Sequence, residues 1–296
     1  MWWRQVDLYN GLVLRRSVVP NLISSNALRE VIRQRRVTRL QRGIYLPGRR
    51  IANPIEAARA ALAAVAEPDS AASHVTAAAV HGLLVPRNLY DREHITIPRP
   101  ERRPHRTRLQ LHTARLPATD IVVLQGVPVT AIARTLVDLC RHWPRLDAVC
   151  AVEDALRRNL VTKDEMESSS HRLAHTPWII RARARFWAAD ARSQSPLETQ
   201  ARLALHDARL PAPEPQLMVE LPTGDRAYLD LGYRRQRLAI ELDGRDVHSL
   251  PHAVFRDRAR QNALISLGWT ILRFTWSDVT RGQDTFVATV AAALRR

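Results

Sequence analysis

The sequence predicts a multidomain protein of mixed α+β and α/β class, and three patterns indicate it. A helical pattern runs into a short β-hairpin within residues 1–50, helices and short strands alternate through the middle, and a longer hairpin carries carboxylates near the C-terminus. The 296 residues suffice for two or three domains with cores of their own. We expect domains at 1–50, 51–176 and 195–296, with a helical linker at 177–194.

Residues 1–50 are predicted to form a winged helix-turn-helix DNA-binding domain. Ser24 and Ser25 can cap a helix with one apolar face, and residues 37–46 read as two strands around an Arg42-Gly43 turn. A preceding helix is expected near residues 14–19. The polar face of the main helix carries Asn26, Arg29, Arg33 and Arg36.

This segment resembles the N-terminal domain of AbiEi-type antitoxins, and Arg-Gly-Ile-Tyr at residues 42–45 is its best local match. The resemblance implies that the helix beginning at Asn26 enters the major groove of DNA and that the wing around Arg42 touches the backbone. The alternative is an amphipathic helix with a solvated basic face.

The middle region is predicted to be a mixed α/β domain. Its periodicity predicts helices at 54–66, 73–84, 130–142 and 146–160 and strands at 94–98 and 109–113. The stretch Ser-His-Val-Thr-Ala-Ala-Ala-Val-His-Gly at 73–82 also resembles the middle part of AbiEi-type proteins. His74 and His81 lie seven residues apart, on one helical face. A metal site needs a third ligand, so packing or hydrogen bonding is the favoured role for both.

The most informative chemical pattern is a β-hairpin at residues 228–244. If its four polar central residues form the loop, Tyr233 pairs with Leu238. Counting back along both strands then sets Asp230 directly opposite Glu241.

A third carboxylate belongs to the same surface. Asp243 lies two residues after Glu241 and therefore shares its face of the sheet. Like charges that face each other weaken a sheet, so the cluster calls for a compensating cation. Mg²⁺ and Mn²⁺ prefer such oxygen ligands. The sequence thus predicts a metal site formed by Asp230, Glu241 and Asp243.

The acidic hairpin also resembles the PD-(D/E)XK nuclease superfamily, most closely its branch of small proteins similar to very-short-patch-repair endonucleases. The match extends over about the last third of the chain, with Glu198 upstream and Arg256, Asp257, Arg260 and Gly268-Trp269 downstream. It implies a restriction-endonuclease-like mixed sheet flanked by helices. It also implies that the acidic residues bind the metal that drives phosphodiester hydrolysis.

One departure from the superfamily concerns its lysine. The usual pattern ends in Glu-x-Lys, but Asp243 stands at that position and the single lysine of the chain is Lys163. The short-patch-repair-like branch uses a histidine nearby, so the resemblance assigns the catalytic proton transfer to His248. An imidazole titrates near neutral pH, which suits a general base.

Each assignment has a structural alternative. Glu198 lies in Ser-Pro-Leu-Glu, the pattern of a capping box, and can simply cap a helix. Asp243 followed by glycine can form a tight turn, and His248 can be a solvated loop residue. Asp230 and Glu241 are harder to explain without a function, because both interrupt otherwise apolar strands.

Basic residues follow the hairpin. A helix is expected at 251–267 and a buried strand at 269–275. Arg256 and Arg260 are four residues apart and share a helical face. Arg273, inside the strand, either holds a phosphate of the substrate or acts as the internal counter-ion of Asp257 or Glu241.

Charge and composition favour a nucleic-acid partner. The net charge is +16, and residues 1–50 hold 11 arginines against 2 acids, so the attraction for phosphate concentrates there. Cys140 and Cys150 form no paired pattern and are expected to be core residues of a reduced protein. The sequence displays no secretory signal and no continuous apolar stretch of membrane-spanning length, so a cytoplasmic location without a membrane partner is expected.

Together these patterns predict a DNA-binding protein with a metal-dependent endonuclease domain. Double-stranded DNA is the expected partner, and a cognate toxin or antitoxin protein is a second one. The alternative is a non-catalytic, antitoxin-like transcriptional regulator that retains a nuclease fold. RNA is a third candidate, because phosphate attraction does not depend on the sugar.

Overall fold

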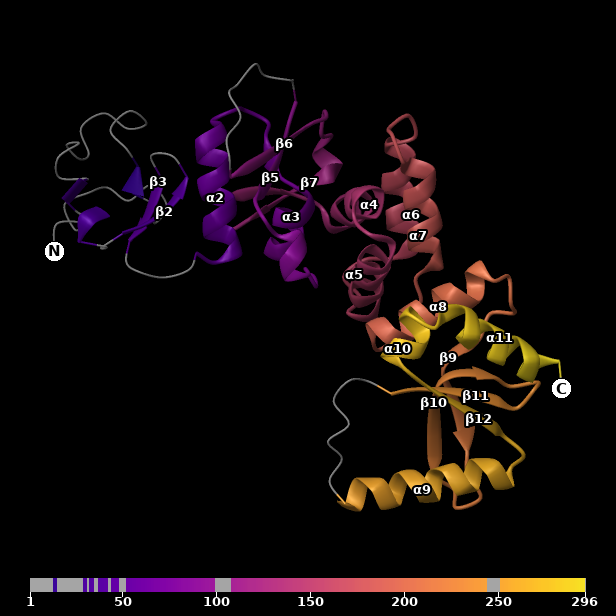
Figure 1. Cartoon of the computed structure of the whole chain (residues 1–296). Helices are drawn as coiled ribbons and strands as arrows, with labels where there is room; N and C mark the ends of the chain where they lie inside the picture. Colours follow the sequence, from indigo (N-terminus) through magenta and orange to yellow (C-terminus); the bar gives the residue numbers. More distant parts are fainter. Residues whose placement is uncertain are drawn as a thin grey trace. The chain divides into compact units, whose positions relative to one another are not determined.

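The computed structural model describes residues 13–14, 29–30, 32–34, 37–41, 44–47, 52–98, 108–243 and 251–295. These residues form sheets of three, five and four strands with helices packed on them (Figure 1). The chain divides into two compact units, the first of Met1–Trp143 with Asn159–Phe186 and the second of Pro144–Arg158 with Trp187–Arg296. The architecture is mixed α/β and multidomain, as the sequence predicts.

The N-terminal sheet has the strand order β1-β3-β2, with β1 at Val13–Leu14, β2 at Val37–Gln41 and β3 at Ile44–Pro47. The predicted hairpin is confirmed: β2 and β3 are antiparallel, with a register shift between Arg39 and Gln41. The prediction of a helix that begins near Leu14 is wrong at that residue, because Leu14 belongs to a strand and pairs with Ile44. Backbone pairing to a distant segment overrides the local helical pattern there.

Little of the predicted main helix falls within the described part of the N-terminal segment. Residues 29–30 and 32–33 are helical. Asn26, Arg36 and Arg42 lie outside the described residues, as does the rest of the helix expected at 14–19.

The first unit contains a five-stranded sheet in the order β6-β5-β4-β8-β7. The strands are β4 (Ala71–Ala72), β5 (Glu93–Ile97), β6 (Leu109–Thr113), β7 (Ile121–Leu124) and β8 (Val127–Thr130). Helices α2 (Pro54–Val65) and α3 (His74–Val80) pack their alanines and valines against it. Strands β5 and β6 were predicted, whereas β4 and the β7–β8 hairpin were not. The β7–β8 turn at Gln125-Gly126 has positive φ at both residues. Glycine adopts this conformation readily, but only the second of the two residues is a glycine.

Three further helices complete the first unit: α4 (Ile132–His142), α6 (Lys163–Arg172) and α7 (Ile179–Ala188). A buried ionic network lies at the start of α4. Arg134 is 2% exposed and contacts Asp120 at 2.9 Å and Asp138 at 2.8 Å. Asp120 also binds Arg172 at 2.5 Å, and Asp138 binds Arg141 at 2.9 Å. Each buried aspartate is thus paired with two arginines, and buried ions require such partners.

The second unit is built on a four-stranded sheet in the order β12-β11-β10-β9. Its strands are β9 (Glu214–Glu220), β10 (Arg226–Tyr233), β11 (Leu238–Asp243) and β12 (Thr270–Thr275). Strands β9, β10 and β11 are antiparallel neighbours, whereas β11 and β12 run parallel and are joined through α9 (Pro251–Ser266). The predicted helix and strand are confirmed here, but β12 is an edge strand with half-buried and exposed residues, not a buried one.

Helices cover both faces of this sheet. On one face, Leu231 and Ile240 pack with Leu205 of α8 (Pro196–Asp207) and with residues of α10 (Trp276–Thr280) and α11 (Gln283–Leu294). On the other face, Leu229 and Ala239 pack with Leu264 of α9. Helix α5 (Arg145–Arg157) packs against α8 and belongs to this unit. The sheet therefore has two separate apolar cores.

Two observations bear on the wider predictions. Within the described ranges, every helix is too short or too polar to cross a membrane. Cys140 and Cys150 are free thiols, and burial raises the pKa of both to about 12. Thiols held in the protonated form are poor nucleophiles, which agrees with a packing role.

The Arg134 network yields a prediction about stability. Replacing Arg134 by methionine removes the guanidinium that Asp120 and Asp138 share and leaves these buried carboxylates only Arg172 and Arg141, so we expect Arg134→Met to lower the free energy of unfolding by about 3 kcal/mol. The matched control is Arg92→Met, because Arg92 pairs with Asp91 at the surface. That control is expected to cost at most about 1 kcal/mol. Urea denaturation of both variants at neutral pH measures the difference, and equal losses would contradict a structural role for the network.

Candidate active site on the C-terminal sheet

The hairpin that carries the carboxylates has the predicted register. Tyr233 pairs with Leu238, and the ladder continues to Leu231 and Ile240. Asp230 comes directly before Leu231 on β10, and Glu241 comes directly after Ile240 on β11. The two acids therefore stand next to the last pair of the ladder, on adjacent strands.

The pleat of β10 is interrupted at Asp230. The β9–β10 ladder pairs Leu217 with Leu229 and Pro215 with Leu231, but it skips Gln216 and Asp230. Gln216 has a φ of +52°, a left-handed conformation that costs energy in a residue with a Cβ atom. Regular alternation would put Leu229 and Leu231 on one face, yet they belong to opposite cores. A local irregularity thus accompanies the buried acid.

The carboxyl group of Asp230 lies in a negatively charged, half-buried environment. Its Oδ2 accepts a hydrogen bond of 2.7 Å from the backbone N–H of Leu242. Burial is the largest cause that raises the pKa of Asp230, and the charges of Glu241 and Glu198 add to it, while the Leu242 hydrogen bond and Arg260 lower it; the resulting pKa is about 6. Asp230 on β10 is thus influenced by carboxylates of β11 and α8.

Glu241 is held by an arginine of α9. It is 9% exposed, and its Oε2 accepts from Nη2 of Arg260 at 3.2 Å. Nη1 of the same guanidinium donates to the backbone oxygen of Tyr228 at 3.0 Å. Arg260 therefore brings positive charge to the carboxylate cluster while it anchors α9 to the edge of β10.

Glu198 takes part in the N-terminal cap of α8 and also influences the carboxyl group of Asp230. Ser195 caps α8 through the backbone N–H of Glu198, and the Glu198 carboxylate accepts from the Ser195 hydroxyl at 2.9 Å and from the N–H of Gln194 at 3.0 Å. It also accepts from the side chain of Gln216 at 3.1 Å. The structural alternative for Glu198 thus holds in part, and it coexists with the influence of Glu198 on Asp230.

Asp243 lies on the same face of the sheet as Glu241, as predicted, but its carboxylate pairs with an arginine of β12. Arg273 of β12 donates to both of its oxygens, at 2.7 and 3.2 Å. Arg273 stands opposite Glu241 in the parallel register, which brings its guanidinium to this face. The structure supports the role of an internal counter-ion for Arg273, but the carboxylate that it pairs with here is Asp243, which was not one of the two predicted partners.

Several predicted site residues cannot be placed. His248 lies outside the described residues, and so does the side chain of Arg256, although Arg256 belongs to α9. Arg29 is exposed. Arg33 is also exposed and pairs with Glu30 at 2.5 Å, which raises its pKa.

Gln216 is a site residue that the sequence reasoning missed. It links Glu198 to the strand position opposite Asp230, and glutamine carries no charge that would mark it. The only signal in the sequence is its position directly after two prolines in Pro213-Glu-Pro-Gln216, which does not identify a hydrogen-bond donor.

The donor set suits a hard divalent cation. Three carboxylates offer the oxygen ligands that Mg²⁺ or Mn²⁺ takes, and the raised pKa of Asp230 indicates that the cluster gains from added positive charge. Among the described side chains, no three of these carboxylates bring their oxygens within 4.8 Å of one another. Closing such a site would require rotation of the carboxylates toward a shared point.

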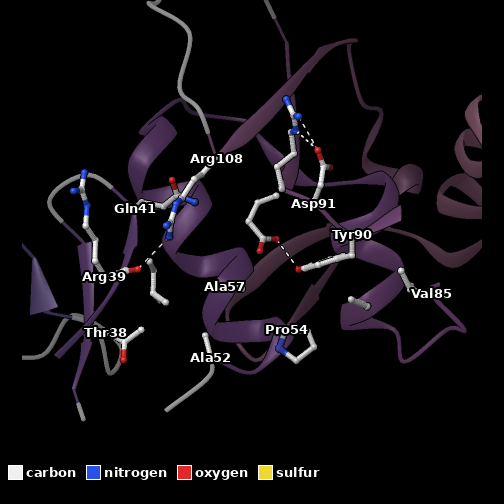
Figure 2. A pocket seen from close by; sticks show the side chains of 14 residues that line it. Thr38, Arg39, Gln41, Ala52, Pro54, Ala57, Val85, Tyr90, Asp91 and Arg108 are labelled. Carbon is white, nitrogen blue, oxygen red and sulfur yellow. Dashed lines mark hydrogen bonds and ion pairs between the residues drawn. The ribbon is translucent and has the colours of Figure 1, made fainter. Parts of the chain in front are cut away.

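A pocket in the first unit offers no comparable chemistry (Figure 2). The hydroxyl of Tyr90 donates to Glu93 at 2.8 Å, and Asp91 pairs with Arg92 at 2.7 Å. Arg108 donates to the backbone oxygen of Arg39 at 3.5 Å. These polar groups satisfy one another and tie β2 to the five-stranded sheet, so we assign the pocket a structural role.

Comparison with known families identifies two regions of the chain. Residues 70–185 match the AbiEi antitoxin C-terminal domain, and residues 216–294 match the restriction-endonuclease-like model REase_MTES_1575. The resemblances of the middle region to AbiEi-type proteins and of the C-terminal third to restriction-endonuclease-like nucleases are thereby confirmed, whereas the very-short-patch-repair-like branch stays a prediction. Residues 1–50 lie outside both matches, so the winged helix-turn-helix stays a prediction.

Two relatives come from Mycobacterium tuberculosis. They are "Uncharacterized protein MT2308" of strain CDC 1551 / Oshkosh and "Uncharacterized protein Rv2248" of strain ATCC 25618 / H37Rv. This chain is 32% identical to each over 173 residues, which cover 58% of this chain and 64% of the relative. The chain thus spans less than two thirds of the length of these relatives.

The environment of Asp230 predicts a pH dependence of stability. Its pKa in the folded state is about 6, above the ordinary value of 3.8, so the folded protein keeps a proton that the unfolded chain releases between about pH 4 and pH 6. The free energy of unfolding therefore falls as pH rises through this window. Asp230→Asn removes the effect, and we expect it to stabilise the metal-free protein by roughly 1–2 kcal/mol at pH 7.5 but not at pH 4.

Urea denaturation in EDTA at the two pH values measures this difference. Asp225→Asn, at an exposed position before β10, serves as the control and is expected to leave the pH dependence unchanged. A wild-type stability that stays flat from pH 4 to pH 6 would show that Asp230 is not in a negatively charged environment.

Proposed function

We propose that this chain, which joins an AbiEi-antitoxin-like region to a restriction-endonuclease-like region, binds DNA and hydrolyses its phosphodiester bonds with a divalent metal ion. The observation that carries the proposal is the placement of Asp230 and Glu241 on adjacent strands within the region matched to the endonuclease model, where the charges of Glu241 and of the upstream Glu198 act on Asp230. Burying carboxylates of like charge costs free energy unless a counter-ion compensates them, and a bound cation would do so.

The arrangement of elements supports an endonuclease-like core. Helix α8 precedes three antiparallel strands, and α9 then returns the chain to the parallel edge strand β12. The carboxylates lie on the two central strands and on the N-terminal turn of α8. The resemblance to PD-(D/E)XK nucleases implies a mixed sheet flanked by helices, and this arrangement supports the proposal.

In this proposal Asp230 and Glu241 would hold the cation. Glu198 would add its negative charge near Asp230, and Asp243 would do so near Glu241. A bound Mg²⁺ or Mn²⁺ would supply Lewis-acid polarisation of the phosphate and a lower pKa for a water molecule. Gln216 orients Glu198 through its amide. Arg260 is well placed to shift from Glu241 toward phosphate charge as that charge develops.

The protein must also move a proton at this site. We keep His248 as the proposed general base, since the chain has no lysine near the hairpin and an arginine would stay protonated. Residues 243 and 248 are close in sequence, so a side chain from this segment can reach the carboxylates.

Binding of double-stranded DNA is proposed to rest on the N-terminal segment. The basic residues concentrate there, and the hairpin of β2 and β3 follows a helical segment, as a wing does. Arg29, Arg33, Arg36 and Arg42, with Asn26, are the proposed contacts. The match of residues 70–185 to an antitoxin domain supports a toxin protein as a second partner.

The alternative is a regulator without catalysis, and one observation favours it. Arg260 and Arg273 already pair with Glu241 and Asp243, so two of the carboxylates have protein counter-ions. A sheet neutralised in this way needs no metal, and the antitoxin-like region would then provide the function by binding DNA and a toxin.

Cleavage of supercoiled plasmid, linear duplex and RNA distinguishes these functions. We expect the wild type to nick DNA with Mg²⁺ or Mn²⁺ and to be inactive in EDTA. Glu241→Gln removes a ligand charge with little change in shape and is expected to lower the rate by at least about 100-fold. Glu220→Gln, an exposed glutamate of the same sheet, is the matched control and should cut at the wild-type rate.

Equal nicking by wild type and Glu241→Gln would mean that the site is wrongly assigned. Sequence-specific DNA binding by both proteins without any cleavage would instead favour the regulator. Cleavage of RNA alone would overturn the choice of substrate but not of the site.

A further inference from the structure

The antitoxin-like region contains a cluster of histidines that the proposed nuclease function does not use. His74 begins α3, directly after β4, while His94 lies in β5 and His112 in β6. In the parallel β5–β6 register His94 pairs with Gln110 and Thr96 with His112, so the two histidines are diagonal neighbours on one face. The backbone N–H of Ser73 donates to the oxygen of His94 at 3.0 Å and fixes the start of α3 beside β5.

The ring nitrogens of these three residues converge. One ligand atom from each lies within 4.8 Å of the other two. Nδ1 of His94 and Nε2 of His112 are 3.2 Å apart. Two nitrogens bound to a tetrahedral Zn²⁺ at about 2.0–2.1 Å lie about 3.3–3.4 Å from each other, so this spacing suits a shared metal.

His74 provides the second observation. Its Nδ1 lies 3.0 Å from the Ser73 hydroxyl, whereas its Nε2 is buried and has no hydrogen-bond partner. A buried polar atom left unsatisfied costs about 1–3 kcal/mol. His74 also has a φ of +49°, a left-handed conformation that a residue with a Cβ atom adopts at a cost. Both costs are explained if the ring is held in position to bind a ligand.

The protonation state of the cluster is also appropriate. Burial lowers the pKa of His94 to about 4 and of His112 to about 3, and it holds the pKa of His74 well below its usual value. The imidazoles are therefore neutral near pH 7, the form in which histidine binds metals. A hydroxyl partner on the second ring nitrogen, as Ser73 provides for His74, is a common way to orient a metal-binding histidine.

We propose that His74, His94 and His112 form a site for a divalent transition-metal ion of the Zn²⁺ type. Imidazole nitrogens favour such ions over Mg²⁺, so this site differs in metal preference from the carboxylate cluster. The exposed His142 is a neighbour of the cluster, with its ring centroid 5.4 Å from that of His74 and 6.3 Å from that of His112.

Metal binding requires one rearrangement. The rings of His74 and His112 are stacked at 3.6 Å with an angle of 13° between their planes. Two nearly parallel rings cannot both aim a lone pair at one point, so the partly exposed His112 must tilt out of the stack. The cluster lies within the first unit, and the tilt needs no movement of its backbone.

Equilibrium dialysis of the full-length protein against Zn²⁺ tests the proposal. Excess Mg²⁺ in the buffer occupies oxygen-ligand sites, and a chelator strips the protein beforehand. We expect one tightly held Zn²⁺ per chain, with affinity at least about 10–100-fold lower in His94→Ala and His112→Ala. His175→Ala, an exposed histidine of the same unit, is the matched control and should retain the wild-type affinity.

X-ray absorption of the Zn²⁺-loaded wild type gives a readout that does not depend on how the variants fold. The proposal requires imidazole nitrogens at about 2.0–2.1 Å. It is overturned if the wild type fails to retain Zn²⁺, if the bound ion is surrounded by oxygen alone, or if both histidine variants bind as the control does. None of these outcomes depends on nuclease activity, so the two proposals fail separately.

Discussion

The C-terminal unit is constrained by the burial of carboxylates of like charge. Asp230, Glu241 and Glu198 come from three elements; Glu241 and Glu198 are buried and Asp230 is half-buried, and the charges of the two glutamates act on Asp230. Coulomb repulsion strengthens as solvent is excluded, so the sheet must provide compensation. It does so with the Leu242 N–H, the Gln216 amide and the Arg260 guanidinium. The break in the β10 pleat and the unusual φ of Gln216 accompany the same feature.

The two units present different donor chemistry. The C-terminal sheet offers carboxylate oxygens surrounded by arginines, which suit a hard cation and a phosphate substrate. The antitoxin-like unit offers neutral imidazole nitrogens, which suit a transition metal. In a protein with both kinds of site, the carboxylate site can serve catalysis or DNA binding, while the histidine site stabilises the fold or senses a metal ion. The histidines lie within the region matched to the AbiEi antitoxin domain and the acidic hairpin within the region matched to the endonuclease model, so each chemistry belongs to its own region of the chain.

The sequence predicts elements well where periodicity is strong and poorly where pairing is distant. The acidic hairpin, its register and α9 follow from alternation and from a glycine stop, since Gly268 has a φ of +79°. The two-residue strands β1 and β4 have no periodicity of their own and form only through partners far along the chain. Likewise, the metal-type cluster around His74 was not foreseen, because its ligands are separated by 18 or more residues and converge only in the folded sheet. Asp243 shows the same limit: its face was predictable, but its partner Arg273 was not.

The central claim is that the carboxylates of the hairpin bind a divalent cation. The most direct measurement is the anomalous difference density of a crystal grown with Mn²⁺. The account predicts one peak within coordinating distance of oxygens from both Asp230 and Glu241, and its loss in a crystal of Glu241→Gln. It is contradicted if Mn²⁺ binds elsewhere, or if the two carboxylates keep their Leu242 and Arg260 contacts with no ion between them.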